Sequence, residues 1–143
     1  MSRRKSIDAK TYLKEIREKR QHIDRLKERR AALHLDVSFG GIDYSTDKVI
    51  SSPKNRLEEA AIKLSERLER IDRTIVRLSM EVDDRIESIE SLADESHRNI
   101  IFKRYVEGLS FEEISVDMSY TYNYTCTLHG EALKEISKHL NFS

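Results

Sequence analysis

The segment ESHRNIIFKRYVEGLSFEEISVDMSYTYNYTCTLHGEALKEISKHL, residues 95–140, contains three stretches of helical spacing separated by turn signals. In the first stretch, apolar side chains recur three and four residues apart: Ile101, Phe102, Tyr105, Val106 and Leu109. This spacing predicts a helix with one apolar face. Gly108 stands where a left-handed residue would end that helix.

A second, shorter helix is predicted from the run Ser110-Phe111-Glu112-Glu113. Ser110 and Glu113 have the spacing of a capping box, in which each side chain binds a free backbone N–H of the first helical turn. The helix should end near Ser119-Tyr120, and Thr121 is the next N-cap candidate. A final helix is then indicated by residues with helical spacing: Thr125, Leu128, Ala132, Leu133, Ile136 and Leu140. A short helix, a tight turn and a longer helix predict a helix-turn-helix.

Upstream of this segment lies the longest periodic pattern of the chain. Starting near Pro53 or Asn55, apolar residues alternate four and three apart for about five heptads: Leu57, Ala61, Leu64, Leu68, Ile71, Ile75, Leu78, Val82, Ile89 and Leu92. The pattern slips only at Arg85, beside the apolar Ile86. A long helix with a coiled-coil seam is expected.

A second helix is expected from Asp8 to Leu33, with a narrower seam. Its core positions are Tyr12, Ile16, Ile23, Leu26 and Leu33, and the charged Lys19 and Arg30 fall on the same stripe. Turn-forming residues such as Gly40-Gly41 then break the periodicity before the long helix. The two helices can pair as an antiparallel hairpin.

The seam of the long helix is longer than the N-terminal helix that could cover it, so part of it is predicted to pack against a second copy of the chain. The residues expected to mediate this self-association are Leu64, Leu68, Ile71, Ile75, Leu78 and Val82. The alternative is a monomeric bundle in which the hairpin packs on the C-terminal domain.

The predicted fold class is therefore all-α, a long helical hairpin followed by a small helix-turn-helix domain. The expected divisions are a basic N-terminal helix over 1–35, a connecting loop over 36–54, a coiled-coil helix over 55–93 and the helix-turn-helix domain over 94–143.

Composition narrows the class of protein. No apolar run approaches the roughly 20 residues that span a bilayer, and the N-terminus lacks the apolar core of a signal peptide, so a soluble cytoplasmic chain without a membrane partner is expected. The single cysteine, Cys126, and five histidines lack metal-site spacing. No nucleophile, base and oxyanion site assembles, and neither an enzymatic activity nor a catalytic residue, cofactor or metal is predicted.

The segment 101–114, the turn Met118-Ser119-Tyr120-Thr121 and the run Leu128-His129-Gly130-Glu131-Ala132-Leu133 together resemble region 4 of bacterial sigma factors. They resemble more closely the phage-encoded transcriptional regulators of the ArpU/RinA type. In that family an R-Y-x-E-G motif, an M-x-Y-S/T turn and an R-L-H-x-x-A-L helix occur together. The similarity extends upstream through 12–17 and the Val49-Ile50-Ser51-Ser52-Pro53 element.

The resemblance implies a phage-type regulator in the cytoplasm of a host bacterium that binds double-stranded DNA with its last helix. In the sigma-like alignment the groove-facing residues are Thr121, Tyr122, Asn123, Cys126 and Thr127, and Tyr124 and Lys134 are flanking backbone contacts. The same alignment places Thr125, Leu128 and Leu133 in the core.

Charge leaves a second function open. Members of the family carry Arg or Lys at several recognition positions, whereas Tyr122–Thr127 contains no basic residue, and residues 94–143 hold five Lys/Arg against eight Asp/Glu. Since phosphate neutralisation supplies much of protein–DNA affinity, the alternative is an adaptor that binds RNA polymerase or another regulator without reading DNA. Asn123 can still pair with adenine without any Arg.

The N-terminal region has the opposite charge, with twelve Lys/Arg and six Asp/Glu in residues 1–36. The arm Ser2-Arg3-Arg4-Lys5 could contact DNA phosphates or acidic segments of another subunit, or simply be solvated.

Several side chains that could serve a binding function also have structural interpretations. His129 could bind a phosphate or a backbone carbonyl, or serve the core. Tyr120 is expected in the core, and Tyr122 and Tyr124 at the surface. Glu113 is explained by capping.

Overall fold

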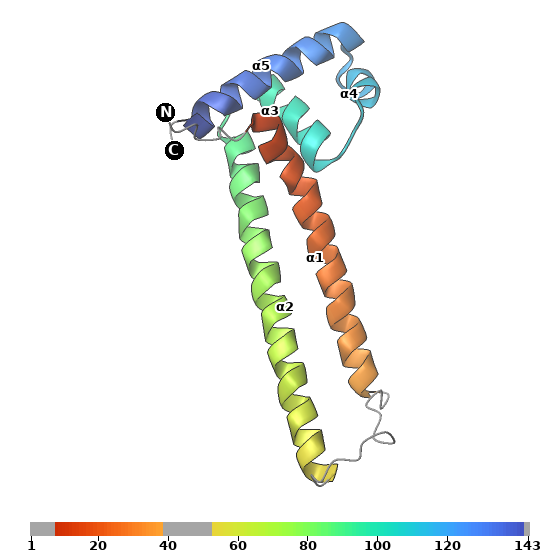
Figure 1. The fold of residues 1–143 in the computed structure, drawn as a ribbon. Helices are drawn as coiled ribbons and strands as arrows, with labels where there is room; N and C mark the ends of the chain where they lie inside the picture. Colours follow the sequence, from red (N-terminus) through yellow and green to blue (C-terminus); the bar gives the residue numbers. More distant parts are fainter. Residues whose placement is uncertain (1–7, 39–52, 142–143) are drawn as a thin grey trace. The chain divides into compact units, whose positions relative to one another are not determined.

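The computed structural model describes residues 8–38 and 53–141, and it confirms the all-α prediction. Within these residues the elements are α1 (Ala9–Ser38), α2 (Pro53–Glu90), α3 (Glu95–Ile101), the π-helical turn η1 (Phe102–Val106), α4 (Phe111–Met118) and α5 (Tyr122–Asn141) (Figure 1). The basic arm and most of the predicted connecting loop lie outside the described residues.

The chain divides into two compact units. One is formed by Gln21–Ser79, and the other joins the residues up to Arg20 with those from Met80 onward. Both long helices therefore contribute to both units. The sequence predicted that the C-terminal domain starts at residue 94. The unit that contains the C-terminal helices starts earlier on α2, at Met80, and also includes the first turns of α1.

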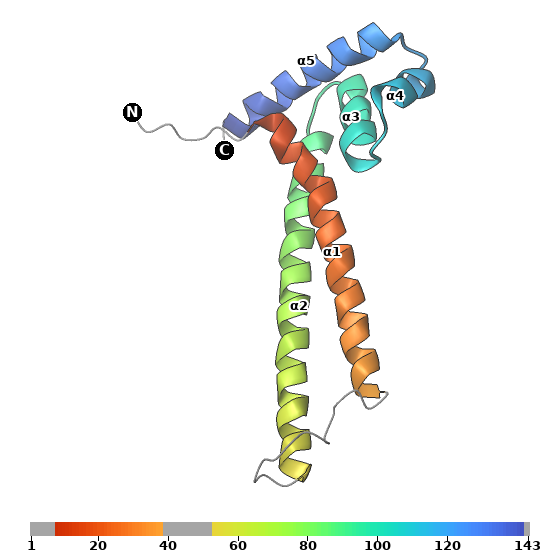
Figure 2. The same ribbon diagram turned by 45° about the vertical axis from the view of Figure 1, so that its right-hand side comes forward.

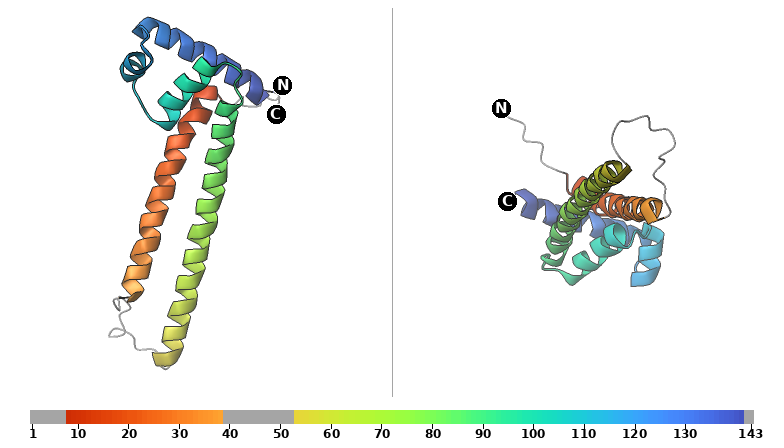
Figure 3. Two further views of the ribbon diagram at one scale, coloured as in Figure 1. Left: turned by 180° about the vertical axis from the view of Figure 1, so that it is seen from behind. Right: turned by 90° about the horizontal axis from the view of Figure 1, so that it is seen from below.

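In the unit Gln21–Ser79, segments of α1 and α2 run antiparallel (Figure 3). Arg30 Nε donates to Asp72 Oδ1 at 2.7 Å, which explains how a charged residue occupies the apolar stripe of α1. Ile23, Ile71 and Leu78 are buried along the same seam. The predicted seam of α2 is thus covered near Ile71 and Leu78 but not at its N-terminal end, where Leu57 is 53% exposed.

In the other unit, the first turns of α1 pair with the last turns of α2. Tyr12 Oη lies 3.2 Å from Ser88 Oγ, and Lys19 Nζ donates to Glu81 Oε2 at 2.8 Å. Ala9 and Leu13 are buried there, whereas Tyr12, which the sequence placed in the seam, is only half-buried.

Arg85, where the heptad pattern slips, has a structural role. Its guanidinium lies over the Tyr12 ring, 4.5 Å from the centroid, and Nε donates to the Tyr12 carbonyl at 3.1 Å. It also pairs with Glu15 and donates to the Glu81 carbonyl at 3.0 Å. Arg85 therefore joins α2 to α1 through the Tyr12 backbone carbonyl and the Glu15 side chain. These contacts explain why a cation stands at an apolar position of the heptad pattern.

The C-terminal helices pack around a small apolar core, with α5 lying across α3 and α4 (Figure 2). Fully buried residues come from each element: Ile100 and Ile101 of α3, Ile114 of α4, and Thr125, Ala132 and Ile136 of α5. Ile101, Thr125, Ala132 and Ile136 were predicted from helical spacing, whereas Phe102, also expected on the apolar face, is 38% exposed because Ile100 takes the inward position.

Local capping signals set the helix ends. Ser110 Oγ accepts from Glu113 N and Glu113 Oε1 accepts from Ser110 N, each at 3.1 Å, so the predicted capping box is confirmed. Gly108 has φ +77° and Ser119 has φ +58°, and these two left-handed residues bound α4. Thr121 Oγ1 accepts from Tyr124 N at 3.1 Å, which confirms the predicted N-cap of α5.

The helix predicted before Gly108 is not regular throughout. After Ile101 the backbone widens into the turn η1, where Glu107 N donates to the Phe102 carbonyl at 3.1 Å. This widening turns Tyr105 toward α5, where its hydroxyl meets His129. A periodic sequence pattern cannot distinguish this turn from α-helix.

Candidate nucleic-acid interface

One face of α5 holds it to its neighbours. Thr125 is fully buried and Leu128 is 3% exposed, and Leu133 is half-buried, so the three expected core positions face inward. The Thr125 hydroxyl donates to the Thr121 carbonyl at 2.9 Å, which satisfies a polar group in an apolar setting. The rest of the first two turns is therefore presented outward.

The opposite face carries most of the residues expected to bind DNA. Thr121, Asn123, Thr127 and Lys134 are exposed. Tyr122 is 47% and Tyr124 is 50% exposed, while Tyr120 is half-buried and packs edge-on against the Tyr124 ring at 4.9 Å. Cys126 is half-buried.

The hydroxyls of this face are partly engaged within the helix. Thr121 serves as the N-cap, and Thr127 Oγ1 donates to the Asn123 carbonyl at 3.0 Å. A hydrogen bond with Cys126 raises the pKa of Tyr122. Among the described residues, the side-chain amide of Asn123 has no hydrogen-bond partner, so it is available to an external ligand.

Helical geometry brings several of these residues into one row. At 100° per residue, Thr127, Gly130 and Lys134 lie within about 40° of Asn123 around the helix axis. No atom lies within 4 Å of the place a Cβ would take at Gly130. A glycine inside a helix lowers its stability by about 1 kcal/mol relative to alanine, and the packing of the chain does not require one here. A bare backbone in this row permits close approach by a bound partner.

The basic residues of the C-terminal region are mostly engaged in structural contacts. Lys103 pairs with Asp117, and this hydrogen bond raises the pKa of Lys103. Arg104 donates to the Leu109 carbonyl at 2.9 Å and lies over the Phe111 ring, and Arg98 donates to the Ala93 carbonyl at 3.1 Å. Of the five basic residues after Asp94, only Lys134 and Lys138 make no ion pair or hydrogen bond with the described residues.

His97 links α3 to α5, a role that its place in the sequence does not predict. Its Nδ1 lies 2.5 Å from Glu135 Oε2, and Nε2 lies 3.8 Å from Glu131 Oε2. The hydrogen bond from His97 lowers the pKa of Glu135. A hollow of about 540 Å³ beside the pair is lined by these residues and by Lys134, Lys138 and His139. The spacing of a histidine on one helix and an acid on another leaves no signal in a single sequence.

Of the roles considered for His129, the structure supports packing in the core. Its Nε2 lies 2.8 Å from Tyr105 Oη, and Phe111 packs edge-on at 4.8 Å. The residue is only 8% exposed, so it does not reach the outer face of α5.

Comparison with protein-family models, with curated proteins and with solved structures finds no match. Across residues 8–38 and 53–141, no helix is long and apolar enough to cross a membrane. The same residues contain no group of three His, Cys, Asp or Glu side chains able to hold a metal ion.

Proposed function

We propose that this chain is a DNA-binding transcriptional regulator of the phage type that the sequence resembles, and that α5 is its recognition helix. The observation that supports this most is the outward row Asn123–Thr127–Gly130–Lys134 on a helix whose other face is fixed by Thr125 and Leu128. A capped α4, a tight turn through Ser119 and the longer α5 have the order of a helix-turn-helix. The protein acts by binding, without a cofactor.

Asn123 is the proposed base-reading residue. Its free amide can both donate to and accept from adenine in the major groove. Thr127 and Thr121 supply hydroxyls, and Lys134 neutralises a phosphate farther along the same face. Tyr122, Tyr124 and Cys126 flank this row. With few free cations, each domain binds weakly, and self-association raises the effective affinity.

The test is fluorescence anisotropy with duplex DNA from upstream of the protein's own gene, measured at several salt concentrations. We expect selective binding over a scrambled duplex, and Asn123→Ala should reduce that selectivity by on the order of tenfold. Asn99→Ala, an exposed asparagine on α3, is the matched control. Absence of binding at low salt would overturn the proposal.

The alternative function is an adaptor that binds RNA polymerase through the same domain. Val116 on α4 is 81% exposed, and Tyr122 and Tyr124 add aromatic surface at the start of α5. Exposed aromatic side chains with few free cations suit a protein partner better than a polyanion. Purified bacterial RNA polymerase should then bind the wild type and lose affinity for Val116→Arg, while no duplex competes. If DNA binds instead and the polymerase does not, the adaptor proposal fails.

Self-association through α2 is a further part of the proposal. Of the six seam residues expected to mediate it, Ile71, Leu78 and Val82 are already buried within the single chain. Leu64, Leu68 and Ile75 are half-buried, and Leu57 is 53% exposed. The contact with a second copy is therefore proposed for the N-terminal half of α2, where the seam is least covered.

A further inference from the structure

We propose that the hairpin unit Gln21–Ser79 carries an oxyanion site that binds a phosphate group. The site is a hollow of about 280 Å³ between α1 and α2, lined by Arg29, Leu33, Arg67, Arg70 and Ile71. This volume is just below the range for small-molecule pockets, roughly 300–1,000 Å³, and suits a phosphate or diphosphate group.

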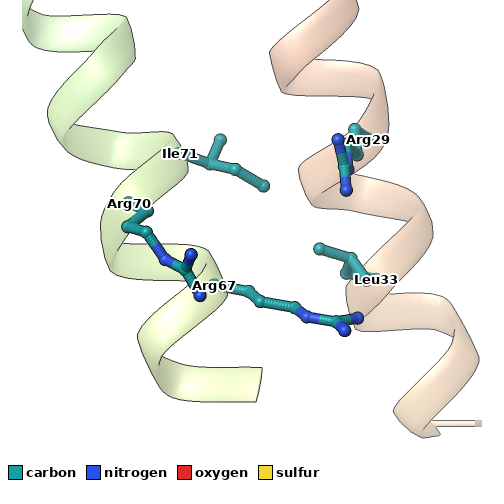
Figure 4. A pocket seen from close by; sticks show the side chains of 5 residues that line it. All are labelled: Arg29, Leu33, Arg67, Arg70 and Ile71. Atoms are coloured by element: carbon teal, nitrogen blue, oxygen red, sulfur yellow. The ribbon is translucent and has the colours of Figure 1, made fainter. Parts of the chain in front are cut away.

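The three guanidinium groups come from both helices. Figure 4 shows the Arg67 side chain extending from α2 toward Leu33 of α1, with Arg70 beside it and Arg29 on the facing helix. Arginine presents its N–H groups in a planar fork that matches the oxygens of phosphate, so three guanidinium groups along one hollow offer donors to a bound anion.

None of these three arginines has an ion-pair partner among the described residues. Two carboxylates on this part of α2 are engaged by other arginines: Asp72 binds Arg30 at 2.7 Å, and Glu69 pairs with Arg73 at 3.7 Å. The remaining acids on the two helical stretches, Glu28 and Glu66, do not line the hollow. Within residues 8–38 and 53–141, no carboxylate pairs with these three arginines.

The excess of positive charge around the hollow comes from the α1 side. Residues 25–33 hold four basic residues and one acidic residue, and residues 66–73 hold three of each. The apolar side chains of Leu33 and Ile71 form part of the lining, and Ile71 is 8% exposed.

The site does not depend on DNA binding by α5. Isothermal titration calorimetry of the full chain with pyrophosphate, at constant ionic strength set by sodium chloride, tests it directly. We expect saturable binding, and Arg29→Gln on α1 and Arg67→Gln on α2 should each weaken it by on the order of tenfold. Because both side chains are exposed, circular dichroism should show unchanged helix content in the variants.

Arg73→Gln is the matched control, since Arg73 lies on α2 but does not line the hollow. Pyrophosphate that fails to saturate, or a control that weakens binding as much as Arg67→Gln, would overturn the proposal in favour of diffuse surface charge. Once binding is established, a competing duplex identifies the source of the phosphate. Displacement of pyrophosphate assigns the site to a nucleic-acid backbone phosphate, and retention assigns it to a small phosphate compound.

Discussion

The hydroxyl oxygen of Tyr105 lies 2.8 Å from Nε2 of His129, and this buried pair joins the π-helical turn to α5. Burial raises the pKa of Tyr105 to about 12 and lowers the pKa of His129 to about 4. Both groups are therefore neutral at pH 7, and each is the hydrogen-bond partner of the other. The orientation of the proposed recognition helix depends in part on an uncharged imidazole.

This pair predicts that stability falls in mild acid. The pKa of His129 is depressed from 6.5 to about 4 by folding, so the unfolded chain binds more protons than the folded chain between these values. Stability from this group is complete above pH 6.5 and declines as the pH falls toward 4. From about pH 7.5 to about pH 5 we expect a loss of about 2 kcal/mol in the free energy of unfolding.

Urea unfolding at the two pH values measures this change. His129→Gln cannot titrate, so the loss over this interval should be much smaller in that variant. The lowered pKa values of Asp94 and Glu135 affect stability only at more acidic pH. An equal loss in wild type and variant would assign the effect to another group.

Removing the Tyr105 hydroxyl should also destabilise the domain. Tyr105→Phe leaves the buried Nε2 of His129 without its partner, which costs about 1–3 kcal/mol in the free energy of unfolding. Tyr124→Phe, at a residue that is 50% exposed, is the control and should change stability little. Equal stability of the two variants in urea unfolding would contradict a role for this hydrogen bond.

The same substitution at two glycines should have opposite effects. Gly108 has φ +77°, and a Cβ there would lie 2.1 Å from Arg17 Nη1, so Gly108→Ala should destabilise by about 1–2 kcal/mol. Gly130 lies in a helix with open space around it, so Gly130→Ala should stabilise by about 1 kcal/mol. Thermal unfolding compares the two.

Gly130→Ala separates stability from binding. If a bound duplex approaches the backbone at Gly130, the alanine variant should bind DNA more weakly than wild type although it unfolds at a higher temperature. Unchanged affinity in the anisotropy assay would show that the bare backbone serves no such approach.

Arg85 should contribute more to stability than an exposed ion pair does. Arg85→Ala removes a guanidinium whose side chain is 13% exposed and leaves Glu15 without this partner, and we expect a loss of about 2 kcal/mol in the free energy of unfolding. Arg73→Ala breaks a pair whose side chains are 69% and 66% exposed, and its effect should stay below about 0.5 kcal/mol. Urea unfolding of both variants tests the contrast, which would be absent if Arg85 were simply solvated.

Self-association is expected to depend on the uncovered part of the α2 seam. Leu57→Glu combined with Leu64→Glu should convert the wild-type oligomer into a monomer, because charge in an apolar contact is strongly unfavourable. Val76→Glu, 58% exposed and outside the seam, should leave the mass unchanged. Light scattering measures all three proteins, and a monomeric wild type would refute self-association.

Much of the fold could be predicted because its signals are local. The capping box of Ser110 and Glu113, the left-handed Gly108 and the N-cap Thr121 each depend on residues a few positions apart. The heptad spacing of α2 likewise follows from a single helix geometry. The exposure of Tyr122 and Tyr124 was predicted from the sigma-like alignment.

Other features could not be predicted, because their partners are distant in the sequence. The residues of the turn η1 have the apolar spacing of an ordinary α-helix, so the sequence does not reveal the π-helical turn. The hydrogen bond between Tyr105 and His129 is visible only in the structure. In α1 the predicted core positions Ile16 and Ile23 are buried. At the start of the helix Ala9 and Leu13 are buried instead of the predicted Tyr12. His97 had no assigned role until Glu135 of another helix was placed beside it.

The sequence by itself determined the order of the α-helices, the ends of α4 and the start of α5, since spacing and capping act within one or two turns. The end of α1 at Ser38 lies beyond the predicted end at Leu33. Only the tertiary structure decided which charged groups meet. It placed Arg85 against the Tyr12 carbonyl, left Asn123 free of partners within the described chain, and brought Arg29 to the same hollow as Arg67. Electrostatic contacts act between any residues that folding brings together, whatever their separation along the chain, and so periodicity does not reveal them.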